Sequence, residues 1–330
     1  MADSIPKTGP TGSRNKWLFC LAFLAGLGVL LAGLSLYFLP KDNTPEAGIQ
    51  NGRACGVLGE PENTLDYLVL GDSLPLTGVN PWVIWERQGF TGYVCAATGQ
   101  DTEGSAELLE AALKNQSPKV VFLEAHQLYK EIDAVDAAAR QVCQLVPVLQ
   151  YHDNWKFLSP KEALRPVQYT NRPIERGYYL RKAVCGTDPG AYMAPTEGTD
   201  PIPRESARIL KRMARSCREQ NIELVLFSLP SPANWTVRRH NTMEDLSREL
   251  GIPYLDGNLL DLGIDWQTDT YDRGDHLNYW GAVKVTRDLG RWFQENLPLP
   301  DHRGEASYEA WDRDLATLPD RIAAKQQESA

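Results

Sequence analysis

Two short stretches of the sequence carry residue types that could do chemistry together. The first is Gly71-Asp72-Ser73-Leu74, directly after the apolar run LDYLVL, and it offers a hydroxyl. The second is DTYDRGDHLNYWGA, residues 269–282, which holds three acidic residues and His276, one of only five histidines. A hydroxyl is a poor nucleophile until a base takes its proton, and a histidine is a better base when a carboxylate holds its other nitrogen. Together the stretches supply the parts of a nucleophilic serine site.

Each stretch also has a plainer interpretation when it is taken alone. Gly-Asp-Ser-Leu after a strand could be a turn, and a histidine among carboxylates could be a solvated loop or a metal site. The sequence has no HExxH segment and no compact His-x-His pair, so we expect neither a metal nor another cofactor. The occurrence of both stretches in one chain favours the catalytic interpretation.

The elements around these stretches predict a parallel sheet. Apolar, β-rich runs alternate with segments whose apolar residues recur at helical spacing, and this pattern is typical of strands covered by helices on both faces. Ser73 then follows the first strand, and His276 lies in a loop just before the last helix, at the sheet edge where such folds bind ligands. The strand candidates are residues 65–70, 92–97, 119–125, 221–230 and 252–256.

An uncharged apolar run from Trp17 to Leu39 precedes this domain. Its 23 residues would span about 34 Å as a helix, enough to cross a hydrocarbon core of about 30 Å. The run is too long for a signal-peptide core and ends in Tyr-Phe-Leu-Pro without a small-residue cleavage site, which favours an uncleaved anchor. Basic residues precede the run, so we expect residues 1–16 in the cytoplasm and the rest outside the cell membrane.

The charge balance excludes one class of partner. The chain has 34 basic and 43 acidic residues, a net charge of −9, and no basic face stands out from its sequence. Nucleic-acid binding depends on clustered Lys and Arg, so we expect no nucleic-acid partner.

The part beyond the anchor divides into three segments, one of which contains an insertion. Residues 40–63 are rich in Gly, Pro and Asn and are typical of a linker, and residues 64–300 form the predicted domain. Within it, residues 151–204 contain many aromatics without clear periodicity and predict an insertion, in which Trp155, Tyr178 and Tyr179 either face a sugar or form a small satellite core. Residues 301–330 predict a polar helical tail.

At this point the chain resembles a known family, the SGNH (GDSL) hydrolase superfamily, with Gly71–Leu74 as nucleophile block and Asp272–His276 as acid–histidine block. It is most similar to the membrane-anchored branch that acts with membrane-bound O-acyltransferases in polysaccharide acetylation, related to D-alanyl-transfer proteins. The supporting segments are NPWVIWERQGFTGYV, KVVFLEAHQLY, YHDNW, SLPSPANW, RRHN and DHLNYWGAVKVT, which cover most of residues 64–300. The resemblance implies a three-layer α/β/α, flavodoxin-like domain after one transmembrane helix.

The resemblance assigns Ser73 as nucleophile and His276 as general base. The superfamily usually places its Asp three residues before the His, where this chain has Arg273. Asp272, four residues before, is the preferred acid, because Asp275 is adjacent to the histidine and poorly placed to fold back onto its ring. Asp275 is the second choice and Asp269 the third.

The resemblance also implies an oxyanion site made of the nucleophile's amide, a glycine and an asparagine. Gly99 matches the glycine region. Residues 124–127 read Glu-Ala-His-Gln where the superfamily has Gly-x-Asn-Asp, so the asparagine is missing from its usual place. His126 and Asn234 are the candidates to replace it, and each could instead be structural or contact the substrate.

Two functions follow as hypotheses. The first is an anchored serine acyltransferase or esterase that moves acyl groups, most simply acetyl, on a cell-envelope glycan beside a membrane-bound O-acyltransferase partner. The second is a catalytically weak module that keeps the fold and binds glycan or partner, a view that the missing asparagine supports.

Overall fold

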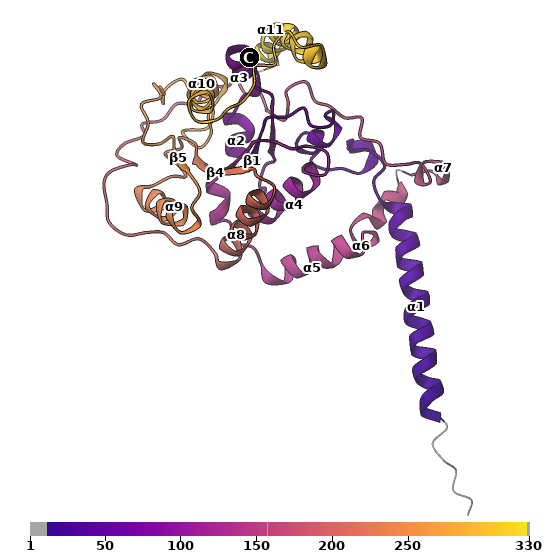
Figure 1. The fold of residues 1–330 in the computed structure, drawn as a ribbon. Coiled ribbons are helices and arrows are strands. Elements are labelled where there is room, and N and C mark those ends of the chain that lie inside the picture. The colour runs from indigo at the N-terminus through magenta and orange to yellow at the C-terminus, as the bar shows by residue number, and fades with distance from the viewer. Residues whose placement is uncertain (1–11, 157, 329–330) are drawn as a thin grey trace, which may run out of the picture. The chain divides into compact units, whose positions relative to one another are not determined.

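Figure 1 shows the fold in the computed structural model, which describes residues 12–156 and 158–328. The chain forms two compact units. Unit 1 contains residues up to Asp42, Glu46–Gly48 and Ala138–Gln168. Unit 2 contains Asn43–Pro45, Ile49–Ala137 and the residues from Tyr169 onward. The predicted catalytic residues Ser73, Asp272 and His276 all lie in unit 2.

Unit 2 is built on a sheet of five strands, which run parallel in every pairing and lie in the order β2-β1-β3-β4-β5. This is the flavodoxin-like order, in which the direction of sheet growth reverses between the first and third strands. Every residue of the first three strands is buried, as expected for a sheet covered on both faces. The strands are β1 (Tyr67–Gly71), β2 (Gly92–Ala96), β3 (Val120–Glu124), β4 (Glu223–Ser228) and β5 (Tyr254–Asp256).

Alternate residues of each strand enter two separate hydrophobic cores. In β3, Val121 and Leu123 pack into the core beneath helices α4 and α8, whereas Val120 and Phe122 pack into the core beneath α10. Side chains of a strand point alternately to the two faces, so two cores mean two covering layers. The predicted three-layer α/β architecture is therefore confirmed.

The helices follow the strands in alternation. The α-helices of unit 2 are α2 (Ser73–Gly78), α3 (Pro81–Gln88), α4 (Thr102–Ala112), α5 (Ala134–Leu145, which belongs to unit 1 from Ala138 onward), α8 (Arg204–Glu219), α9 (Val237–Leu250), α10 (Tyr279–Asn296) and α11 (Glu309–Glu328). The short 3₁₀ helices are η2 (Ala54–Gly59), η3 (His126–Tyr129) and η5 (Ala306–Tyr308), and η1 (Pro45–Ala47) lies at the boundary of the units.

Helix ends agree with the local sequence signals. Gly251 ends α9 with a left-handed backbone (φ 62°), which glycine adopts without a Cβ penalty. Asn278 caps α10, because its side-chain oxygen accepts hydrogen bonds from the backbone N–H groups of Trp280 and Gly281. Asn278 therefore fixes the start of α10 two residues after His276.

The folded unit is larger than the sequence pattern indicates. Ala54 and Val57 of η2 are buried in the core, although residues 40–63 have the composition of a linker. The C-terminal helix α11 also packs onto the rest of unit 2, because the buried Arg176 pairs with Glu60 and with Asp314 of α11. A buried arginine bound by two carboxylates satisfies its charge, and composition gave no sign of this contact.

Unit 1 contains helix α1 (Gly12–Phe38) together with α6 (Val148–Tyr151), η4 (His152–Lys156) and α7 (Pro160–Ala163), each of which contacts α1. The segment Lys16–Phe38 is long and apolar enough to cross a membrane, and nearly all of its side chains are exposed. This length and composition are consistent with the predicted single span.

Candidate active site

Ser73 is presented where β1 turns into α2. The Asp72 side chain caps α2 by accepting a hydrogen bond of 3.0 Å from the Leu74 backbone N–H. The turn requires glycine at position 71, since a Cβ there would lie 2.4 Å from Pro75 Cγ. The half-buried Ser73 hydroxyl therefore lies at the carboxyl end of β1, beside the point where the strand order reverses.

His276 is held by a short closed loop. An antiparallel bridge joins Thr270 to Leu277, and the Thr270 hydroxyl donates to His276 O (2.8 Å) while it accepts from Gly274 N (2.8 Å). Arg273 and Gly274 both have left-handed backbones, with φ of 64° and 86°. This pair of left-handed residues turns the chain sharply between the acid and the histidine.

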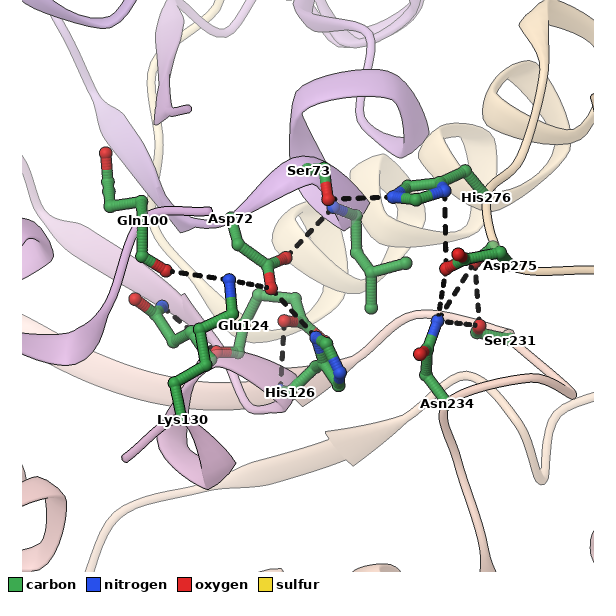
Figure 2. A network of polar contacts seen from close by, with 12 residues as sticks. Asp72, Ser73, Gln100, Glu124, His126, Lys130, Ser231, Asn234, Asp275 and His276 are labelled. Atoms are coloured by element: carbon green, nitrogen blue, oxygen red, sulfur yellow. Dashed lines mark hydrogen bonds and ion pairs between the residues drawn. The ribbon is translucent and has the colours of Figure 1, made fainter. Parts of the chain in front are cut away.

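Ser73, His276 and Asp272 form a continuous chain of hydrogen bonds. His276 Nε2 lies 2.8 Å from Ser73 Oγ, as Figure 2 shows. On the opposite side of the ring, His276 Nδ1 lies 2.7 Å from Asp272 Oδ2, and the other Asp272 oxygen accepts the His276 backbone N–H at 2.7 Å. Both carboxylate oxygens of Asp272 are thus bound by one residue, which fixes the carboxylate against the ring.

Asp275 is a more distant neighbour of the histidine. Its Oδ1 lies 3.3 Å from His276 Nδ1 and also accepts a hydrogen bond from the Asn234 side-chain amide. Asn234 Nδ2 donates further to Ser231 Oγ at 2.9 Å, and Figure 2 shows this group beside Asp275 and away from Ser73. The structure therefore engages Asn234 with Asp275 and does not aim its amide at the serine.

The electrostatics of the loop favour a basic histidine. Burial alone lowers the pKa of His276, but the Asp272 hydrogen bond and the charges of Asp275, Asp272 and Asp72 outweigh it and raise the pKa above 6.5. The ring of Tyr271 stacks on the imidazole with centroids 5.6 Å apart. His276 is thus both oriented and made a stronger base by its own loop.

A second charged group lies on the other side of Asp72. His126 Nδ1 and Lys130 Nζ contact Asp72 Oδ2 at 2.8 and 2.9 Å. Burial would raise the pKa of Asp72, but its bond with His126 and the charges of His126 and Lys130 lower the pKa to about 2. Burial and the charge of the neighbouring Asp72 raise the pKa of Glu124 well above its usual range. Asp72 is therefore anionic at pH 7, and its charge favours the protonated form of Glu124.

The position of His126 bears on its expected role. Figure 2 shows its ring on the far side of Asp72 from Ser73, with Nδ1 directed at the carboxylate. The bond to Asp72 occupies that nitrogen. The structure thus places His126 as a partner of Asp72, the residue that caps the helix beginning at Ser73.

Gly99 lies three residues beyond β2, whose last residue Ala96 pairs with Gly71 in the register of the sheet. It is exposed, has a left-handed backbone (φ 75°), and no atom lies within 4 Å of the position of a Cβ. Gly99 is thus on the loop beside the serine loop and borders open space.

Sequence reasoning missed Lys130 and Tyr271, for which spacing gave no signal.

Among the residues that the structure describes, two groups contain donors of the kind that bind metals, Asp72-Glu124-His126 and Asp272-Asp275-His276. In the first, the Lys130 ammonium already provides a positive charge at Asp72. In the second, His276 Nδ1 bonds to Asp272. A cation at either group would have to displace these contacts, so both donor sets fit proton handling better than metal binding.

The left-handed backbone at Gly274 gives a stability prediction. A Cβ at this position would meet Thr187 Cγ2 at 2.8 Å. Gly274→Ala should lower the free energy of unfolding by more than the backbone penalty of about 1–2 kcal/mol. Gly263→Ala is the matched control, since Gly263 has φ 63° and nothing within 4 Å. Denaturant unfolding measures both variants, and equal losses would contradict the steric contribution.

Comparison with known proteins finds similarity only among solved structures, since the sequence matches no described family and no curated protein. A lipase/acylhydrolase from Enterococcus faecalis is 12% identical over 72% of this chain and 99% of its own, with a TM-score of 0.38. The psychrotrophic esterase EstA from Pseudoalteromonas sp. is 13% identical over 70% and 94%, with a TM-score of 0.34. A GDSL-like lipase from Bacteroides thetaiotaomicron is 12% identical over 70% and 89%, with a TM-score of 0.33. The activities in these names belong to those proteins.

Proposed function

We propose that the protein is a serine-dependent acyl hydrolase or acyltransferase. The observation that carries the proposal is the chain of hydrogen bonds from Asp272 through His276 to Ser73, with distances of 2.7 and 2.8 Å. A nucleophile bonded to a base, and a base oriented by a third group, is the arrangement that acyl transfer through a covalent intermediate requires. The asparagine that is absent from residues 124–127 would be an oxyanion donor, so its absence leaves the nucleophile, the base and the acid in place.

The reaction would proceed in two halves. Ser73 Oγ attacks the acyl carbonyl as His276 Nε2 takes the hydroxyl proton, and the leaving alkoxide departs with that proton, leaving an ester on Ser73. An acceptor hydroxyl then gives its proton to His276, attacks the ester and releases Ser73, which regains the proton. Water as acceptor gives hydrolysis and a sugar hydroxyl gives transfer. The Ser73 and Gly99 backbone N–H groups are the proposed oxyanion donors.

The finer proposal places this chemistry on an envelope glycan. Helix α1 would anchor the protein in the cell membrane with residues 1–16 inside and unit 2 outside. A membrane-bound O-acyltransferase would supply the acyl group, most simply acetyl. Confinement to one membrane would give the two proteins a high effective concentration without tight binding.

A cavity in unit 2 supports a sugar as ligand. It has a volume of about 210 Å³ and is lined by four aromatic side chains together with polar groups that include Asn80, Glu175 and two arginines. The lining residue Tyr178 is 2% exposed, and its hydroxyl has no partner within the described part of the chain. Aromatic faces with a few fixed polar groups suit a small polar ring. One lining residue, Tyr279, follows His276 by three positions in the sequence.

A covalent probe tests the proposal. A fluorophosphonate should label the full-length protein in detergent, and peptide mass analysis should locate the adduct on Ser73. Heat-denatured protein is the control, because labelling depends on the folded base. An unlabelled native protein would overturn the catalytic proposal and favour the binding-module hypothesis.

The raised pKa of His276 gives a pH prediction. The base must be neutral to accept the serine proton, so ester hydrolysis should fall as the pH decreases through the histidine pKa, at a value above 6.5. Asp275→Asn removes one of the charges that raise this pKa and should move the acid limb of kcat/KM to lower pH. Initial rates across a pH series measure both. An acid limb below pH 6.5 in the unmodified protein would contradict the electrostatic argument.

A further inference from the structure

The segment Ala138–Gln168 of unit 1, which we call the interfacial segment, lacks a core of its own. Among its described residues only Val148, Asn154 and Ala163 are buried. Large apolar side chains are instead exposed, with Leu145 and Leu164 both at 83% and Trp155 at 63%. A chain that buries so little apolar surface does not offset its ordering entropy in water, so this segment needs a contact outside the protein.

The few buried residues of this segment attach it to one end of helix α1. Val148 N donates to Ser35 Oγ at 3.1 Å, and Asn154 Nδ2 donates to Phe38 O at 3.0 Å. Gln168 N donates to Lys41 O at 2.9 Å, just beyond the helix. These bonds fix the segment at the level of the last turn of the apolar span, which ends at Phe38.

That level identifies what the segment contacts. The span of 23 residues is about 34 Å long, slightly more than a hydrocarbon core of about 30 Å, so its last turn lies at the boundary with the headgroups. Trp155 beside Lys156 is the residue pair expected there, because an aromatic ring and a long cation both suit the interface. The segment thus lies at the level of the headgroups wherever α1 spans a membrane.

The charge of the segment favours anionic lipid. Residues 138–168 contain four basic and two acidic residues, a net charge of +2, whereas the whole chain has a net charge of −9. A basic, apolar surface in an acidic protein fits the headgroups of a negatively charged leaflet, to which each cation adds attraction.

We propose that residues 138–168 form a second, peripheral membrane contact, with Leu145, Leu149, Trp155 and Leu164 inserted among anionic lipid headgroups beside the anchor. The proposal rests on the proposed anchoring by α1. The contact adds to the single helix a second point of attachment, which limits how far the part of unit 1 outside the span can tilt from the bilayer surface.

Quenching of tryptophan fluorescence by brominated lipid tests this contact. The full-length protein is reconstituted into vesicles of three parts phosphatidylcholine to one part phosphatidylglycerol, with bromine near the headgroup end of the acyl chains. Trp17 reports the anchor and Trp155 the interfacial segment. Trp235 of unit 2, which is 1% exposed, serves as the control, because a buried ring does not contact lipid. Each is changed to Phe separately, so the apolar ring is retained.

The expected result is that Trp155→Phe and Trp17→Phe each remove about half of the quenchable emission, as two interfacial rings require, while Trp235→Phe removes none. Loss with Trp17→Phe but not with Trp155→Phe would overturn the second contact and leave the anchor intact. No loss with either would overturn both. In vesicles of phosphatidylcholine alone the Trp155 component should decrease, and an equal component would overturn the preference for anionic lipid.

Discussion

Ser73→Ala is expected to lower kcat/KM for a simple ester such as p-nitrophenyl acetate by about 10³-fold or more. The reason is that the variant keeps the base and the fold but loses the atom that forms the covalent intermediate. The substitution removes only Oγ, whose contact is the 2.8 Å bond to His276, and the Asp72 cap of α2 remains. Initial rates and the intact mass after mixing with the ester measure the loss of turnover and of the acetyl adduct together.

Ser216→Ala is the matched control, because Ser216 is a half-buried serine of α8, away from the strand ends that form the site. It should keep the full rate and the adduct. A Ser73→Ala protein that still gains one acetyl group, or that hydrolyses the ester at the unmodified rate, would show that another residue is the nucleophile.

Asp272→Asn is expected to lower kcat by about 10³–10⁴-fold, although an amide fits the same space. The carboxylate accepts hydrogen bonds from His276 Nδ1–H and from the backbone N–H of the same residue. An amide that keeps the backbone bond can present its NH₂ group to the ring, and the histidine then adopts the tautomer with its proton on Nε2. Nε2 cannot accept the Ser73 proton in that form.

Asp275→Asn provides the comparison that decides between the two acids. Asp275 lies 3.3 Å from Nδ1 and contributes charge, so its removal should change the pH profile and lower the plateau kcat by about 10-fold or less. If Asp275→Asn is the more damaging substitution, the assignment of the orienting acid must be reversed. Circular dichroism of both variants shows whether a loss of activity reflects a loss of the fold.

Asp72, His126 and Lys130 form a second charged group beside the Ser73–His276 pair. Asp72 is nearly fully buried and held anionic by His126 and Lys130, and its charge contributes to the raised pKa of His276. The site therefore contains two acid–histidine pairs on either side of one short helix start. Only the pair with His276 contacts the serine.

The sequence by itself determined the fold class and the chemical parts. Wholly apolar strands that alternate with amphipathic helices require a sheet covered on both faces, and Gly71-Asp72-Ser73 after the first strand requires a hydroxyl at the carboxyl edge of that sheet. Local rules were also sufficient for the helix signals at Gly251 and Asn278, because a cap depends on neighbours within a few residues.

Tertiary structure alone decided the partners of each side chain. The two left-handed residues between Asp272 and His276 bring an acid four positions away onto the ring, and a spacing rule does not contain backbone angles. The engagement of Asn234 with Asp275, and of His126 with Asp72, joins residues 41 and 54 positions apart. Hydrogen bonding between distant loops depends on strand order and register, which arise from packing of the whole domain rather than from any single stretch of sequence.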